Sequence, residues 1–207
     1  MTTIKIDQYE VKRQLAAGAT SSIYLVEDPI HQRDVIMKLW QPEGNFDADT
    51  LKREVDAMIA LKHPNIPEVY DYVENHDQPY YTMEYIEGDT LLHRVQSSET
   101  FLDEATIIQW GIQLCDILNH FHSNSSQPYL FRDVKPTNVM INRDGKMYLI
   151  DFGITVVFKT DHKYDLIGTE GYASPEQYKG VVDPRRAIYA LAATFHHLAP
   201  SIDPHPA

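Results

Sequence analysis

The sequence contains very little cysteine, since Cys115 is the single one among its 207 residues. One thiol can form neither a disulfide framework nor a zinc site built from several thiolates. The chain also lacks an apolar run of transmembrane length, and its N-terminus lacks the apolar core of a secretory signal peptide. We therefore expect a cytoplasmic protein with no membrane segment within this chain.

Basic residues are scarce beside acidic ones: 18 Lys and Arg against 30 Asp and Glu give a formal net charge of −12. The sequence offers no basic stripe that could follow a phosphate backbone, which argues against a nucleic acid partner. Hydrophobic residues make up 43% of the chain, an ordinary value for a globular protein. A chain of this length predicts one domain with a sizeable core.

The most informative stretch of the chain is 129–153, whose middle is predicted to form a hairpin. Two short apolar runs flank Asp144-Gly145, a two-residue turn signal in which both central positions adopt positive φ. Folding about this turn pairs position 138 with position 151, so we expect Asn138 and Asp151 side by side. An amide oxygen beside a carboxylate is a hard, oxygen-only site suited to Mg²⁺.

Just upstream, Asp133 and Lys135 lie on a segment that Pro136 keeps out of helix. A carboxylate base, a cation and two metal ligands are thus predicted to converge. Any one of these residues alone fits an ordinary surface hairpin with solvated charges. The four together at these spacings, ending in Asp-Phe-Gly, favour a functional site over a plain hairpin.

This stretch resembles two motifs of the protein kinase family. Phe-Arg-Asp-Val-Lys-Pro-Thr-Asn at 131–138 resembles the catalytic loop, with Phe131 where the family usually has His, and residues 151–153 are Asp-Phe-Gly. Further on, Gly168-Thr169, together with Lys135, resembles the Ser/Thr class, and the following Ser-Pro-Glu-Gln-Tyr resembles bacterial members.

The resemblance implies a role for each polar residue of the stretch. Asp133 would accept the proton of a substrate hydroxyl, and Lys135 would steady the γ-phosphate. Asn138 and Asp151 would hold Mg²⁺. The substrates would then be ATP and a protein that carries a Ser or Thr hydroxyl.

The first part of the chain resembles the nucleotide-binding half of a kinase. A small-residue loop joins two predicted strands, about 9–16 and 22–27, although by itself it also fits a plain hairpin turn. Only Gly18 remains of three family glycines, which let backbone N–H groups approach phosphates. The resemblance implies nucleotide contacts from Ala16, Ala17, Gly18, Ala19, Ile23, Ile36, Met83, Glu84, Ile86 and Met140.

An ion pair is predicted between Lys38 and Glu54. Alternation in the strand 34–40 places Lys38 between Ile36 and Trp40, opposite the face of Val35, Met37 and Leu39. Glu54 falls on the apolar stripe of a helix predicted over 50–61, where a carboxylate needs a cation. A solvated pair of Glu54 with another basic residue is the alternative. In the family, such a Lys–Glu pair grips the α- and β-phosphates.

We expect an α+β protein of the two-lobed protein kinase-like fold over 1–207. The N-lobe, 1–87, holds a small antiparallel sheet, with strands near 68–74 and 80–84, and one helix. The C-lobe, 88–207, is mainly helical, with helices near 91–96, 103–122 and 183–197, and is incomplete because it lacks the family's last helices. The long helix is expected to turn Ile108, Ile112, Cys115, Leu118 and Phe121, or their neighbours, inward.

The chain departs from the family pattern in its phosphate loop and at three further places. Ile36 replaces a small Ala over the adenine, Ala187 replaces an Asp that holds the catalytic loop, and the chain ends at Ala207. The missing helices would leave Ile188 and Leu191 uncovered, and self-association through this C-lobe surface would follow. Three interpretations stay open: an active Ser/Thr kinase, a nucleotide-binding pseudokinase acting by conformation, and an inactive truncated fragment.

Overall fold

The computed structural model divides by its contacts into two units, residues 1–60 with 67–86 and residues 61–66 with 87–207. The second segment of the first unit ends at Ile86, and the second unit resumes at Glu87. The structure describes residues 5–18, 20–41, 48–74, 77–97, 102–123, 128–158, 167–179 and 183–198.

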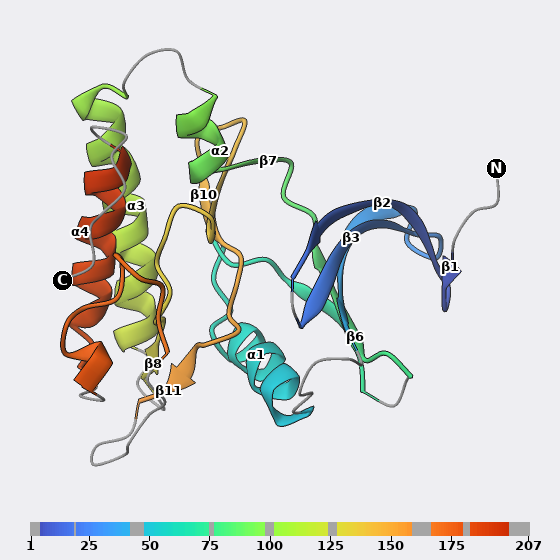
Figure 1. Cartoon of the computed structure of the whole chain (residues 1–207). Helices are drawn as coiled ribbons and strands as arrows, with labels where there is room; N and C mark the ends of the chain where they lie inside the picture. The colour runs from blue at the N-terminus through green and yellow to red at the C-terminus, as the bar shows by residue number, and fades with distance from the viewer. Residues whose placement is uncertain are drawn as a thin grey trace. The chain divides into compact units, whose positions relative to one another are not determined.

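The first unit is built on an antiparallel sheet with the strand order β1-β2-β3-β4-β6-β5 (Figure 1). Only β6 and β5 break the sequential order, because β6 inserts between β4 and β5. The strand bounds are Lys5–Ile6 (β1), Tyr9–Ala17 (β2), Ser21–Asp28 (β3), Arg33–Trp40 (β4), Val69–Val73 (β5) and Tyr80–Glu84 (β6).

The alternation predicted for the central strand β4 is confirmed. Val35, Met37 and Leu39 lie in one buried cluster on the same face of the sheet. Tyr9 of β2, Val26 of β3 and Tyr80 of β6 complete this cluster. The other face of β4 carries Lys38 between Ile36 and Trp40, and all three are buried.

The single helix of the described first unit, α1, runs Ala48–Ala60 and packs against β5. Its apolar side chains recur every three or four residues, as an amphipathic helix requires. Leu51, Val55 and Met58 are at most 3% exposed, and Glu54 shares their face at 1%. The helix therefore presents a carboxylate toward the interior of its unit, as expected.

The second unit is mainly helical, and its helices α3 and α4 lie side by side (Figure 1). None of the described helices has both the length and the apolar character needed to span a membrane. The bounds are Gly88–Thr90 (β7), Leu91–Gln96 (α2), Glu104–Ser123 (α3), Tyr129–Leu130 (β8), Val139–Asn142 (β9), Met147–Leu149 (β10), Val156–Val157 (β11) and Arg186–Leu198 (α4).

The predicted inward face of α3 is partly wrong. Ile108 and Ile112 are 52% and 60% exposed, and Cys115 is exposed as well. The helix is apolar on more than one side, so periodicity left two stripes to choose from. The stripe that the fold buries consists of Trp110, Leu114, Ile117, Leu118 and Phe121.

The expectation for α4 is also only partly met. Ile188 is 63% exposed, whereas Leu191 is buried at 6%. Self-association through the exposed surface of this unit stays a prediction.

The hairpin of β9 and β10 has a different register from the predicted one. Met147 pairs with Ile141, and the Ile150 N–H donates to the Asn138 carbonyl at 3.1 Å, so position 138 faces 150 rather than 151. Of the turn residues, only Gly145 has positive φ, +79°.

The turn is therefore a three-residue loop closed by a left-handed glycine, not a two-residue turn. The side chain of Asn142 stabilises it, because its Oδ1 accepts the N–H groups of Asp144 and Lys146 at 3.0 and 2.9 Å. The Asp-Gly pair fits both turn types, and this asparagine selects the longer one. Asp151 consequently lies one residue beyond the position opposite Asn138.

The position of Gly88 leaves no room for a side chain. It pairs with Asn142 in β9, and an added Cβ would lie 2.2 Å from the carbonyl oxygen of Ile141. The clashing atoms belong to the backbone of the paired strand, which cannot move without disturbing the pairing. Gly88→Ala should therefore lower the free energy of unfolding by about 1–3 kcal/mol. The matched control is Gly18→Ala, whose new Cβ would meet its nearest atom at an ordinary 3.4 Å. Urea unfolding of both variants measures the difference, and equal midpoints would contradict the expected clash.

Candidate active site

The segment 131–138 of the second unit forms an irregular loop, as Pro136 predicts. Aromatic packing fixes its beginning: the Phe131 ring lies 5.6 Å from that of Phe121 and 5.5 Å from that of Phe152, between ring centroids. Val134 is fully buried, and its carbonyl accepts the Thr194 hydroxyl at 3.3 Å. Apolar packing thus fixes the position of the loop, and its polar side chains can form hydrogen bonds and bind ligands.

The Asp133 carboxylate is the centre of a polar network in this unit. Lys135 Nζ lies 2.7 Å from its Oδ2, to which Asn138 Nδ2 also donates at 2.8 Å. The Thr169 hydroxyl donates to its Oδ1 at 2.6 Å and accepts from Lys135 Nζ at 2.8 Å. Three of the residues that the sequence brought together, Asp133, Lys135 and Asn138, are therefore in direct contact.

This network has the chemistry of a hydroxyl-activating site. The Asp133 side chain is 13% exposed, and one of its oxygens already accepts a hydrogen bond from a hydroxyl group. A carboxylate in that geometry can take the proton of an attacking alcohol. The Lys135 ammonium, 22% exposed beside it, can neutralise charge that develops on a transferred group.

The side chains of Asn138 and Asp151 offer ligands that suit a hard cation. Asn138 Nδ2 donates to both the carbonyl and the carboxylate of Asp133. Asn138 Oδ1 accepts the Thr137 hydroxyl at 3.2 Å, and an amide oxygen has a second lone pair for a cation. Asp151 Oδ1 accepts the Gly153 N–H at 3.2 Å. Among the described residues no cluster of three or more acidic, His or Cys ligands occurs. Two oxygen ligands nevertheless fit Mg²⁺, which usually completes its shell with water and phosphate oxygens.

In the first unit, Lys38 and Glu54 form a buried ion pair. Lys38 Nζ lies 2.7 Å from Glu54 Oε1, and the two residues are 8% and 1% exposed. Tyr81, directly opposite Lys38 on β6, donates its hydroxyl to the same oxygen at 3.0 Å. The expected pairing is present, and Tyr81 is a third member that the sequence did not indicate.

The residues predicted to contact a nucleotide fall mainly on the first unit. Ala16 and Ala17 pair with β3 at the end of β2, and the Gly18 N–H closes the connection onto the Ser21 carbonyl at 2.8 Å. Ala19 lies outside the described residues. Ile36 and Met83 pair across β4 and β6. The others are Ile23 on β3, Glu84 and Ile86 at and after the end of β6, and Met140 on β9 of the second unit.

Two residues of the second unit were not among the predicted site residues. Thr169 reaches Asp133 from 36 positions along the chain, and the Gly168-Thr169 pair was the signal that could have identified it. Gln177 Nε2 donates to the Ile167 carbonyl at 2.6 Å and more weakly to the Arg132 carbonyl at 3.5 Å. It thereby ties the segment that carries Thr169 to the loop that carries Asp133, and no local pattern indicates this.

Comparison with known proteins identifies the family of the chain. The model of the protein kinase domain matches residues 9–206. Serine/threonine-protein kinase PrkC of Bacillus subtilis is 30% identical over 198 residues, which cover 92% of this chain and 30% of that protein. Serine/threonine-protein kinase PknB of Mycolicibacterium smegmatis is 32% identical over 205 residues, covering 93% and 32%.

The chain thus spans about a third of the length of these relatives. The expected α+β kinase-like fold class is confirmed, with an antiparallel sheet and one helix in the first unit and a mainly helical second unit. The chain belongs to the protein kinase family, and the relatives named here are bacterial Ser/Thr protein kinases.

Proposed function

We propose that this chain transfers the γ-phosphoryl group of ATP to a Ser or Thr hydroxyl of a protein substrate. The observation that carries the proposal is the contact of Asp133 with a threonine hydroxyl and with Lys135. An alcohol bound where Thr169 now donates would have its proton within reach of the carboxylate. Its oxygen would attack the γ-phosphorus, the bond to the β-phosphate oxygen would break, and ADP would leave.

Each polar residue then has a distinct task. Asp133 orients the hydroxyl and takes its proton, and Lys135 compensates the charge on the γ-phosphoryl oxygens. Lys38, held by Glu54, binds the α- and β-phosphates. Asn138 and Asp151 would hold Mg²⁺, which neutralises phosphate charge when it is bound.

Transfer of radiolabel from ATP to a basic model protein tests the proposal. We expect incorporation that needs Mg²⁺ and that appears on Ser or Thr after acid hydrolysis. No incorporation above a blank without enzyme, over a range of Mg²⁺ and protein concentrations, would overturn it.

Asp151→Ala should remove the metal dependence of nucleotide binding. Without this carboxylate, Mg²⁺ loses its charged protein ligand, so the ATP-induced rise in melting temperature should no longer depend on Mg²⁺. Thermal shift with ATP, with and without Mg²⁺, measures this. Asp144→Ala, an exposed carboxylate of the hairpin turn, is the control. A variant that keeps the full Mg²⁺-dependent shift would show that Asp151 is not a ligand.

Nucleotide binding without transfer is the second candidate. The residues Ala16 and Ser21 in the phosphate loop and the buried Ile36, opposite Met83, favour it. It predicts a thermal shift with ATP together with no incorporation of label. An inactive fragment predicts neither signal.

A further inference from the structure

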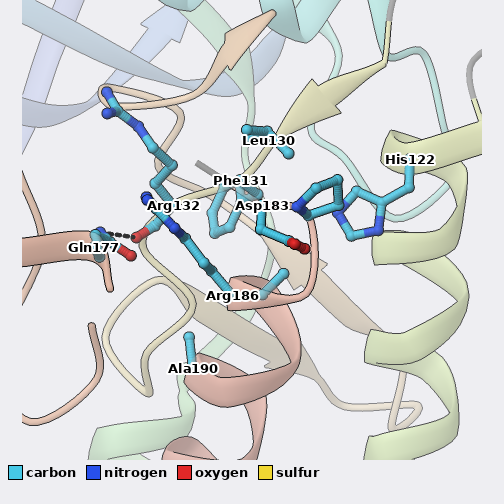
Figure 2. A pocket seen from close by; sticks show the side chains of 10 residues that line it. His122, Leu130, Phe131, Arg132, Gln177, Asp183, Arg186 and Ala190 are labelled. Carbon is cyan, nitrogen blue, oxygen red and sulfur yellow. Dashed lines mark hydrogen bonds between the residues drawn. The ribbon is translucent and has the colours of Figure 1, made fainter. Parts of the chain in front are cut away.

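A small cavity lies inside the second unit, where the catalytic loop meets the beginning of α4 (Figure 2). Its volume is about 10 Å³, room for roughly one water-sized occupant. The lining residues that matter here are His122, Phe131, Arg132, Asp183, Arg186 and Ala187.

The guanidinium of Arg186 is the unusual feature of this cavity. Arg186 is only 6% exposed, and its buried Nε and Nη2 have no hydrogen-bond partner within the described part of the chain. Burial lowers the pKa of Arg186 because it disfavours the charged form. An arginine nonetheless stays charged in a protein, and an uncompensated buried charge is expensive.

The charges around Arg186 are of both signs, because Glu176 and Asp183 attract it while two other arginines lie nearby. It is the first residue of α4, a helix of 13 residues, where the backbone N–H groups and the helix dipole favour an anion. Arg185 precedes it, and Arg132 lines the same cavity while its Nε donates to the Ile154 carbonyl at 2.8 Å. Figure 2 shows Arg186 extending from α4 toward Arg132.

The Asp183 carboxylate in the lining attracts Arg186 electrostatically, but its hydrogen bonds go to Arg185. Asp183 accepts Arg185 Nε at 2.9 and 3.0 Å and the Arg185 backbone N–H at 2.8 Å, and these bonds hold its pKa at about 2. Glu176 attracts Arg186 electrostatically, but among the described residues no ion pair within 4.0 Å joins Arg186 to a carboxylate.

We propose that this cavity binds a single halide ion of chloride size, with Nε and Nη2 of Arg186 as its donors. The volume admits one monatomic ion and excludes a four-oxygen anion such as phosphate. A water molecule would fill the same space, but it could not compensate the buried positive charge. His122 Nε2, also buried and unpartnered, is a further polar atom of the lining, and burial lowers the pKa of His122, which keeps its imidazole neutral. The site is independent of the proposed phosphoryl transfer, because it would act on the stability of the second unit.

A bound halide would raise the stability of the folded chain by mass action. At constant ionic strength, exchanging 300 mM sodium gluconate for sodium chloride should therefore raise the melting temperature by about 3 °C. In Arg186→Met this rise should vanish, because the donors are gone. In Arg143→Met, which removes a 79% exposed arginine side chain, the rise should persist. An equal rise in Arg186→Met, or no rise in the wild type, would overturn the proposal.

Ala187→Asp gives an internal test, since Ala187 lines the same cavity and is buried at 4%. A tethered carboxylate there would take the place of the free ion. We expect a higher melting temperature in gluconate and a chloride-induced rise reduced at least threefold. A chloride response equal to that of the wild type would contradict the assignment.

Crystals of the unmodified chain grown in sodium bromide decide the matter even if the variants fold poorly. Diffraction at the bromine absorption edge should give an anomalous peak within hydrogen-bond distance of Arg186 Nε and Nη2. Density at that point without anomalous signal would identify a water molecule and overturn the halide site.

Discussion

Asp133→Asn should lower the proposed rate of phosphoryl transfer by about 10²–10⁴-fold, the usual contribution of a general base, while nucleotide affinity should change little. The proposed role of the carboxylate is confined to the transfer step, so its loss should fall on kcat rather than on the binding of ATP. Steady-state kinetics with labelled ATP and thermal shift with unlabelled nucleotide measure the two quantities separately.

The fold should tolerate this substitution. An asparagine oxygen at position 133 can still accept from Lys135 and Asn138, and its amide can donate to the Thr169 hydroxyl in place of the present bond. The variant should therefore melt within a few degrees of the wild type. Asp144→Asn makes the same chemical change at the exposed hairpin turn and should leave the rate unaltered. Equal rates for Asp133→Asn and the wild type would show that Asp133 is not the general base.

Local periodicity was sufficient to predict the main strands and the helix of the first unit, although it missed the short strand β1. The bounds of β6 match the prediction at both ends, and those of β4 differ by one residue at its start. Alternation along β4 and the stripe of α1 each fix the direction of one side chain, and together they predict the contact of Lys38 with Glu54. Such patterns are informative here because one charged residue interrupts an otherwise apolar face, as Lys38 does between Ile36 and Trp40.

Elsewhere the local pattern allowed two answers. The Asp144-Gly145 pair is compatible with two turn lengths. The hydrogen bonds of the Asn142 side chain select the longer one, and the turn rule applied to the sequence did not consider this residue. Helix α3 carries two apolar stripes, and only its packing partners determine which one is buried.

Contacts between distant positions were the least predictable part of the site. The Thr169 hydroxyl meets Asp133 across 36 positions of the chain, and Gln177 meets the Arg132 carbonyl across 45. The burial of Arg186 is a similar case, since a long charged side chain at a helix start is normally solvated. No residue-level pattern predicts such burial, because the cavity is formed by several separate segments.

Lys38→Met should be the most destabilising single change in the first unit, with an expected loss of about 3–5 kcal/mol in the free energy of unfolding. Removal of the ammonium leaves Glu54, 1% exposed, as a buried carboxylate whose Oε1 still accepts the hydrogen bond from the Tyr81 hydroxyl. Glu54 Oε2 already has no hydrogen-bond partner among the described residues, so nothing there compensates the charge.

The loss of stability should come from the unpaired charge of Glu54 rather than from the missing lysine side chain, and a double-mutant cycle separates the two contributions. In Lys38→Met/Glu54→Gln the charge is gone, while the amide oxygen can still accept from Tyr81. We therefore expect the double variant to recover at least half of the loss in urea unfolding. Lys52→Met breaks the exposed pair with Asp56 on the same helix and should cost at most about 1 kcal/mol. If Lys38→Met matched that control, or if the double variant were no more stable than Lys38→Met, the pair would not be the buried, interdependent unit that its 2.7 Å contact indicates.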